Sequence, residues 1–288
     1  MIPRPFEYHA PTTLPDAVGL LKQYGDEAKL LAGGHSLLPM MKLRFAQPGH
    51  LIDIGKIAEL KGIREDGGTL VIGAMTTENE IIWSKLLQDK CPLLVEGARQ
   101  ISDPQVRYKG TLGGDIAHGD PGNDHPALML ALGASFVLKG AGGERVVPAE
   151  GFFIGTYDTL MQPDEIMTQI RIPVPAAGSG YCYAKLKRKT GDFAAAAAAV
   201  LLRMQGGVVG DVHIALTNVA PTPLKAAAAE AALRGKSLDD AAINAAARLA
   251  MNICSPTPDQ RGDVEYKTAM AGEMTVRALR TARSRAAP

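Results

Sequence analysis

The chain has 288 residues, of which 46% are hydrophobic and 21% charged, and its formal net charge is +1 at pH 7. These proportions are typical of globular proteins and exclude a mostly disordered chain. The length predicts about two domains. The balanced charge predicts no nucleic-acid partner. The longest apolar run, residues 193–202, is shorter than the roughly 20 residues of a membrane span, so at most peripheral membrane association is expected.

The cysteine content and the N-terminus indicate a compartment. The three cysteines, Cys91, Cys182 and Cys254, are far apart and form no CxxC pair. The first residues contain no apolar stretch of the kind found in secretory signals. The sequence therefore predicts a cytoplasmic protein whose cysteines form no iron–sulfur cluster and no structural zinc site.

Hydrophobic periodicity, interrupted by glycine and proline, predicts many short elements. Helices are expected over residues 16–24, 77–87, 93–101 and 127–132. Strands are expected over residues 29–32, 50–54, 69–72, 135–138, 166–172 and 181–186. Residues 173–180, rich in proline and glycine, are a candidate linker. Beyond it, a strand is expected over 208–216 and helices over 224–233, 238–253 and 266–285.

A run of six alanines, Ala194–Ala199, is ambiguous. Intrinsic propensity favours a helix. However, Gly206 and Gly207 follow, and the next residues alternate like a strand. A hairpin is therefore also possible, because a strand crowded on both faces accepts alanine, and propensity alone does not decide between the two.

Two glycine-rich turns carry the clearest chemical signal. The first follows a predicted strand, and the second lies some eighty residues later: Ala32-Gly33-Gly34-His35-Ser36 and Thr111-Leu112-Gly113-Gly114-Asp115. Glycine lets the backbone approach a ligand closely, and successive N–H groups can surround phosphate oxygens. Together the turns could hold a diphosphate, although each could also be an ordinary tight turn. The sequence has no GxGxxG fingerprint, and Gly235-Lys236-Ser237 lacks the first glycine of a phosphate-binding loop.

A third cluster is dense in acids and histidines and contains Asp115, His118, Asp120, Asp124 and His125. Three interpretations remain open. The cluster could bind a metal, Asp124 could accept hydrogen bonds from a ribityl or ribose hydroxyl, or the residues could stabilise turns.

A basic strand, residues 185–189, places Lys185, Lys187 and Lys189 on one face. This pattern fits a solvated surface, a cation beside an anionic flavin, or a subunit contact. Phe193 could pack in the core or lie against an aromatic ring.

These residues resemble a known family. The two glycine turns are similar to the flavin-binding motifs of the medium subunits of molybdenum hydroxylases, the xanthine oxidase family. The resemblance runs from Ile2 to the C-terminal helix. Two segments, residues 118–126 and 185–189, resemble the carbon monoxide dehydrogenase branch more narrowly.

The resemblance implies an α+β fold. It consists of a PCMH/vanillyl-alcohol-oxidase-type FAD-binding domain over residues 1–177, with two α+β subdomains of about 1–55 and 56–177. A C-terminal domain over 178–288, like that of carbon monoxide dehydrogenase flavoproteins, then has a three-stranded antiparallel sheet and helices. On this basis the alanine run is expected to be a strand.

The resemblance also implies which residues contact FAD. No residue of this chain is implied to be catalytic. The implied cofactor-binding residues are Lys29, Leu30, Leu31, Ala32, Gly33, Gly34, His35, Ser36, Ile101, Thr111, Gly113, Gly114, Asp115, His118, Asp124, Met167, Lys185 and Phe193. Of these, Lys185 is expected near the flavin as a positive charge, and Phe193 is expected to stack.

The implied function is electron transfer within a heterotrimer. A large subunit with a molybdenum cofactor, and with copper, oxidises CO with water to CO₂, and a small subunit with two [2Fe–2S] clusters relays the electrons. FAD on this chain passes them to a quinone or cytochrome, in a dimer of heterotrimers at the inner face of the cytoplasmic membrane. The alternatives are a relative acting on an aldehyde, a purine or another N-heterocycle, a free-standing flavin oxidase, and a scaffold protein that has lost FAD.

Overall fold

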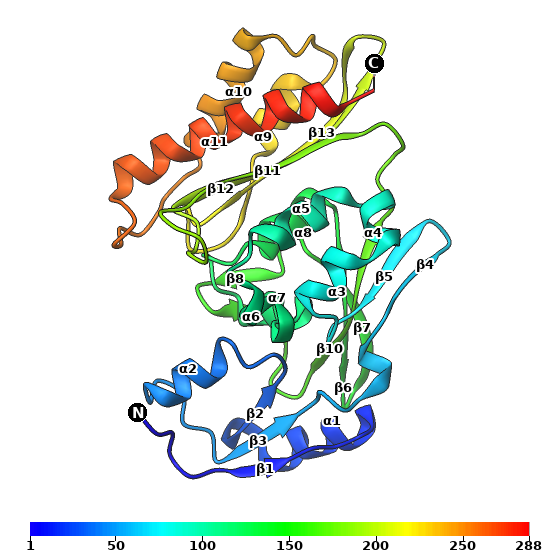
Figure 1. Ribbon diagram of the computed structural model, residues 1–288, viewed down its shortest axis with the longest axis vertical. Helices are drawn as coiled ribbons and strands as arrows, with labels where there is room; N and C mark the ends of the chain where they lie inside the picture. The colour runs from blue at the N-terminus through cyan, green and yellow to red at the C-terminus, as the bar shows by residue number, and fades with distance from the viewer. Residues whose placement is uncertain (288) are drawn as a thin grey trace.

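Figure 1 shows the computed structural model, which describes residues 1–287, as three layers of sheet and helix along its long axis. The N-terminal layer is a parallel sheet in the order β1-β3-β2. Helix α1 is capped by Thr13 before its first residue and by Gly25 after its last, and it buries Ala17 and Leu21. The elements of this layer are β1 (Glu7–His9), α1 (Leu14–Tyr24), η1 (Gly25–Glu27), β2 (Ala28–Leu31), α2 (Leu37–Lys42) and β3 (His50–Asp53).

The middle layer is an antiparallel sheet in the order β4-β5-β10-β6-β7, accompanied by short helices. Its core includes Ile72, Leu94, Leu128 and Phe136, all essentially inaccessible to solvent. Its elements are η2 (Ala58–Leu60), β4 (Ile63–Asp66), β5 (Thr69–Gly73), α3 (Glu78–Trp83), α4 (Lys85–Lys90), α5 (Pro92–Gln100), α6 (Pro104–Lys109), α7 (Leu112–His118), α8 (His125–Ala131), β6 (Ser135–Gly140), β7 (Gly143–Pro148), β8 (Phe153–Gly155), β9 (Asp158–Thr159) and β10 (Ile166–Pro173).

The C-terminal layer is an antiparallel sheet in the order β11-β12-β13-β14, with the long helix α11 across it (Figure 1). The alanine run enters β12, the strand between β11 and β13. Ala197 and Ala199 pack into the core of the middle layer, whereas Ala196 and Ala198 pack into the core under α10 and α11. The elements are β11 (Gly180–Leu186), β12 (Ala196–Gln205), β13 (Val208–Thr217), β14 (Leu224–Lys225), α9 (Ala227–Leu233), α10 (Asp240–Met251) and α11 (Val264–Arg285).

The structure corrects three details of the predicted elements. The single helix expected over 77–87 is two helices, because Ser84 is extended and its side chain caps α4 at Leu87. The helix expected from residue 224 begins at Ala227, because Leu224 and Lys225 pair with β13. This two-residue β14 adds a fourth strand to the three long strands expected in the C-terminal sheet.

Across residues 1–287, every helix is too short or too polar to serve as a membrane span.

Candidate functional site

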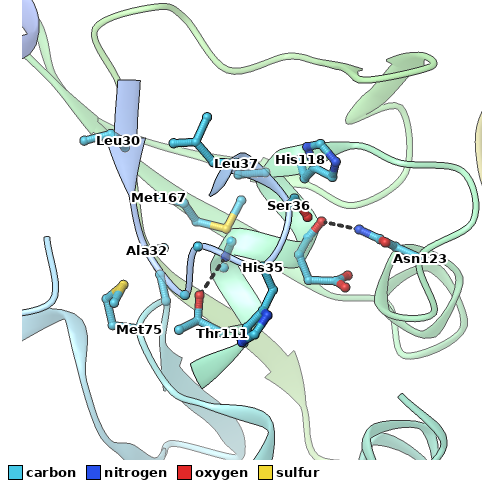
Figure 2. Close-up of a pocket in the computed structure, with 18 of the residues that line it drawn as sticks. Leu30, Ala32, His35, Ser36, Leu37, Met75, Thr111, His118, Asn123 and Met167 are labelled. Atoms are coloured by element: carbon cyan, nitrogen blue, oxygen red, sulfur yellow. Dashed lines mark hydrogen bonds between the residues drawn. The ribbon is translucent and has the colours of Figure 1, made fainter. Parts of the chain in front are cut away.

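A cavity of about 660 Å³ lies where the parallel sheet meets the middle layer. Its lining comes from β2 and the turn after it, from the turn that leads into α7, and from β10. Residues of β11 and of the loop before β12 complete it. Figure 2 shows the turn carrying Ala32, His35 and Ser36 facing the helix that begins after Thr111. The cavity therefore lies between segments distant in the sequence.

The first glycine turn is bent and tightly packed. Gly34 has a φ of +78°, which disfavours residues with a side chain. A Cβ on Gly33 would lie 2.3 Å from the carbonyl oxygen of Lys109. Since Lys109 lies two residues before the second turn, only a residue without a side chain at position 33 lets the two segments touch.

The second glycine turn is fixed by a cap and by packing. The hydroxyl of Thr111 accepts a hydrogen bond from the N–H of Gly114, at 3.2 Å (Figure 2). A Cβ on Gly113 would lie 2.5 Å from the Cβ of Ala74. A Cβ on Gly114 would lie 3.3 Å from the Cβ of Ala32 in the first turn. The structure thus brings both turns together at one cavity.

All of the predicted site residues except Leu31 line this cavity. Leu31 lies between Leu30 and Ala32, which do line it. The Leu31 side chain packs against the turn itself, because its Cδ1 lies 3.2 Å from where a Cβ on Gly34 would be. The lining residues that the sequence predicted are Lys29, Leu30, Ala32, Gly33, Gly34, His35, Ser36, Ile101, Thr111, Gly113, Gly114, Asp115, His118, Asp124, Met167, Lys185 and Phe193.

Asp124 and Lys185 bind each other at the cavity wall. The ammonium of Lys185 donates to one carboxylate oxygen of Asp124 at 2.6 Å, and both side chains are buried. The hydroxyl of Tyr183 donates to the other oxygen at 2.5 Å. Burial and the Asp124 carboxylate raise the pKa of Tyr183 well above its usual value. The Lys185 charge is therefore balanced by Asp124 within the protein.

Asp115 is half-buried, and one of its carboxyl oxygens, Oδ1, is shielded from solvent without a protein partner. Burial raises the pKa of this carboxyl from its ordinary 3.8 to about 8. The nearby His125 is held by Glu78, whose carboxylate lies 2.8 Å from its Nε2. Burial lowers the pKa of His125, but the charge and hydrogen bond of Glu78, together with the charges of Asp115 and Asp124, raise it to about 9. Asp115 thus offers the cavity a polar group without a protein partner.

The histidines and acids of residues 115–125 do not converge into a metal-binding group among residues 1–287. The ring of His125 is directed at Glu78, whereas His118 packs against Tyr157 with ring centroids 4.9 Å apart. Burial lowers the pKa of His118, which favours its neutral form. Asp120 instead accepts a hydrogen bond from the N–H of Gly122, as expected for a residue that stabilises a turn.

Phe193 lies at the rim of the cavity and is 45% exposed, so it is not a core residue. The neighbouring Asp192 is buried between two cations and lies 2.9 Å from both Arg188 and Arg261. The guanidinium of Arg261 lies 5.4 Å from the centroid of the Phe193 ring. The C-terminal loop that carries Arg261 therefore anchors the rim.

Sequence reasoning missed several lining residues. Ser102 and Tyr157 adopt positive φ angles of 42° and 59°, a strained conformation that no sequence pattern indicated. Glu78 lines the cavity and pairs with His125, 47 residues away. Met75 and Asn123 come from a loop and a turn (Figure 2). Their spacing carries no periodic signal, so only the tertiary structure could reveal them.

The matching family descriptions cover nearly the whole chain. The family "FAD binding domain in molybdopterin dehydrogenase" matches residues 4–175. The family "CO dehydrogenase flavoprotein C-terminal domain" matches residues 181–282. The chain therefore belongs to the flavoprotein family of the molybdopterin dehydrogenases.

Within that family the chain is most informatively compared with curated relatives of similar length. It is 60% identical to the carbon monoxide dehydrogenase medium chain of Hydrogenophaga pseudoflava, over 100% of both chains. It is 52% identical to the corresponding chain of Afipia carboxidovorans, over 99% of both. Its identity to the caffeine dehydrogenase subunit beta of a Pseudomonas species is 33%, over 99% of this chain and 97% of the relative.

Solved structures agree with this placement. The chain matches carbon monoxide dehydrogenase from Hydrogenophaga pseudoflava with a TM-score of 0.99 and 63% identity, over 100% of both chains. It matches quinoline 2-oxidoreductase from Pseudomonas putida 86 with a TM-score of 0.94 and 32% identity, over 99% of both chains. The fold is thus that of the medium chains, whichever substrate the complex oxidises.

Proposed function

We propose that this chain is the FAD-binding, electron-transfer subunit of a carbon monoxide dehydrogenase. One observation carries the proposal: a single cavity lined by two glycine turns, in a chain that is 60% identical over its full length to such a medium chain. The redox chemistry belongs to the flavin, and the protein supplies binding, orientation and electrostatics.

The cavity fits FAD on three grounds. Its glycine turns present backbone without Cβ atoms, as close approach to phosphate oxygens requires. Ile101 and Met167 provide apolar surface for a ring system. The unpartnered Oδ1 of Asp115 can pair with a cofactor group. We propose that the lining residues predicted from the sequence hold the cofactor, with Ser36 and Thr111 beside the diphosphate.

In this role, the chain's own residues bind and shield the cofactor. The Asp124–Lys185 pair keeps one wall rigid and electrically neutral. Phe193, steadied by Arg261, covers part of the rim and limits water entry. Lys185 and Phe193 lie beyond residue 177. We therefore further propose that an FAD-binding domain (1–177, with subdomains of about 1–55 and 56–177) and a C-terminal domain (178–288) build the site jointly.

The partners follow from the same proposal. A large molybdenum-cofactor subunit would oxidise CO, and a small subunit with two [2Fe–2S] clusters would deliver the electrons to this chain. We propose a dimer of such heterotrimers in the cytoplasm, at the inner face of the membrane, with a quinone or cytochrome as the acceptor. The related structure described as a Cu,Mo-CO dehydrogenase indicates the metals expected on the large subunit.

The second candidate is the medium subunit of a dehydrogenase for an aldehyde, a purine or another N-heterocycle. Relatives named for caffeine, glyceraldehyde and nicotine are 33%, 34% and 33% identical to this chain. The much higher identity to the carbon monoxide enzymes favours CO.

In the test, the chain is co-expressed and purified with the proposed large and small subunits. The content of FAD, Mo, Cu and Fe and the rate of CO oxidation are then measured. The matched variants are Gly33→Ala, whose Cβ would strike the carbonyl of Lys109, and Gly142→Ala, which has open space around it. We expect Gly33→Ala to weaken FAD binding by at least about tenfold, since 1.4 kcal/mol already gives that factor. Full FAD binding by Gly33→Ala would contradict the proposed site, and a complex inactive on CO but active on a heterocycle would favour the second candidate.

A further inference from the structure

Three side chains of the kinds that ligate metal ions lie together on the N-terminal sheet. Strands β1 and β3 are parallel, and their register places Glu7 beside His50. Because side chains alternate along a strand, Glu7 and His9 lie on the same face of β1. The strand pairing thus gathers one carboxylate and two imidazoles, none of which lines the cavity described above.

The distances between the donor atoms suit a metal ion. Nε2 of His9 lies 3.1 Å from Nδ1 of His50, and that nitrogen lies 3.6 Å from Oε2 of Glu7. Tetrahedral bonds of 2.0–2.1 Å place donors roughly 3.3 Å apart. All three donor atoms lie within 4.8 Å of one another, the one such group found in residues 1–287. Glu7 is mostly exposed, so its carboxylate is free to close the remaining gap.

The two imidazoles are held in place before any ion binds. Tyr24, at the end of α1, stacks on the ring of His50 with centroids 3.6 Å apart and an angle of 12°. The same tyrosine stacks on His9 at 5.2 Å. The His50 side chain is only 15% exposed. Rings fixed in this way lose little further freedom when they coordinate a metal.

The packing of β1 does not itself require these side chains. The strand has three residues and none of them is buried. It lies at the edge of its sheet and pairs only with β3 in the described structure. A hydrogen bond between the two imidazoles explains their mutual distance but not the adjacent carboxylate. A bound cation would explain all three positions and would tie β1 to β3.

We propose that Glu7, His9 and His50 form a binding site for a divalent transition-metal ion, with Zn²⁺ as its representative. Imidazole nitrogens favour Zn²⁺, Ni²⁺ and Cu²⁺ over Mg²⁺ and Ca²⁺, which prefer oxygen ligands. Three protein donors leave a fourth position for water. The cysteine count could not reveal this site, because its donors are histidine and glutamate.

The experiment titrates Co²⁺ and Zn²⁺ into the full-length, cofactor-loaded protein after chelation. We expect one Co²⁺ per chain, with the intense visible absorption of tetrahedral coordination. His9→Asn and His50→Asn should each weaken binding at least tenfold, and Glu7→Gln should weaken it less. His213→Asn is the matched control and should bind normally, because His213 lies on β13 beside Asp211. Zn²⁺ should raise the Tm of the wild type but not of the His9→Asn/His50→Asn double variant.

Three results would overturn the proposal: no saturable binding, undiminished binding by the folded double variant, or weak octahedral Co²⁺ absorption. Circular dichroism establishes that each variant is folded. His9→Asn tests the site at a position outside the core even if His50→Asn is unstable. Because FAD content is measured separately, failure of this site leaves the proposed flavin function unaffected.

Discussion

The most unusual single residue is Asp115, a buried carboxyl at the cavity. Its backbone carbonyl accepts a hydrogen bond from Asn123, while its side-chain Oδ1 has no protein partner. Burial raises the pKa of its carboxyl to about 8, although the positive charge of His125 acts to lower it. In the cofactor-free protein, the neutral acid is therefore the favoured form at neutral pH.

This shift predicts a pH dependence of stability. Between pH 3.8 and about 8 the folded chain keeps a proton on Asp115 that the unfolded chain has lost. The free energy of unfolding should therefore fall as pH rises, by up to about 1.4 kcal/mol per pH unit from this group. Asp115→Asn should remove that slope in the cofactor-free protein, as measured by urea unfolding.

The measurement is cleanest between pH 3.8 and 6.5, where His125 is protonated in both the folded and the unfolded chain. Asp89→Asn is the matched control, since Asp89 forms an exposed pair with Lys85. An unchanged slope in Asp115→Asn would show that this carboxyl is already ionised in the folded protein.

The pair of Asp124 and Lys185 predicts strong energetic coupling. Lys185→Met leaves a buried carboxylate with only the Tyr183 hydroxyl, which should cost about 3–5 kcal/mol. The double variant Asp124→Asn/Lys185→Met should cost less than the sum of the single variants. A double-mutant cycle by urea unfolding measures this.

The control for that cycle is Lys225→Met, which removes an exposed pair with Glu150 and should cost less than about 1 kcal/mol. Additive effects of Asp124→Asn and Lys185→Met would refute the coupling.

At the scale of elements, two glycines are expected to respond to alanine in opposite ways, one because of tight packing and the other because of helix propensity. A Cβ on Gly180 in β11 would lie 1.9 Å from the carbonyl oxygen of Ala282 in α11, so Gly180→Ala should destabilise the protein by about 1–3 kcal/mol. Gly19 lies within α1 with nothing near its Cβ position. Gly19→Ala should therefore stabilise by about 0.5–1 kcal/mol. Chemical denaturation compares the two, and equal effects would contradict this packing of β11 on α11.

The sequence predicted the elements whose periodicity was strong. Residues 16–24, 50–54 and 208–216 fall within or near α1, β3 and β13. Propensity alone would have made the alanine run a helix, and it was the family resemblance that indicated a strand. The physical reason is that β12 is crowded on both faces, where only small side chains fit. The break at Ser84 depends on one extended residue, which periodicity does not detect.

The sequence indicated the site residues through the glycine turns and the family resemblance. The turns could be predicted because their paired glycines can be identified directly in the sequence. It could not indicate Glu78, whose partner His125 lies far along the chain, or the strained Ser102. It also could not show that Lys185 is neutralised by Asp124, since the two residues are 61 positions apart in the sequence and only the tertiary structure brings them together.

At the scale of the whole molecule, the two family regions share a core. Tyr183, Ala197 and Ala215 lie beyond residue 180 but pack into the middle layer's hydrophobic cluster. Arg285 near the end of α11 pairs with Glu96 of α5 at 2.6 Å. Neither region therefore buries its apolar surface alone.

This shared core predicts one cooperative unfolding transition for the full chain. Ala198→Leu overfills the cluster beneath α11, and it should lower the Tm of that one transition by roughly 2–4 °C per kcal/mol of destabilisation. Differential scanning calorimetry measures both effects. Two resolved transitions, with only one shifted by Ala198→Leu, would show instead that the regions unfold independently.

The two-sided alanine strand has a consequence for protein engineering. A chimera that joins residues 1–177 of one relative to the remainder of another inherits β12 and α8 from different parents. Ala197 and Ala199 then meet a surface that did not evolve beside them. Such exchanges will succeed only when the surface receiving the strand is transplanted with it, so the practical unit of recombination is the whole chain.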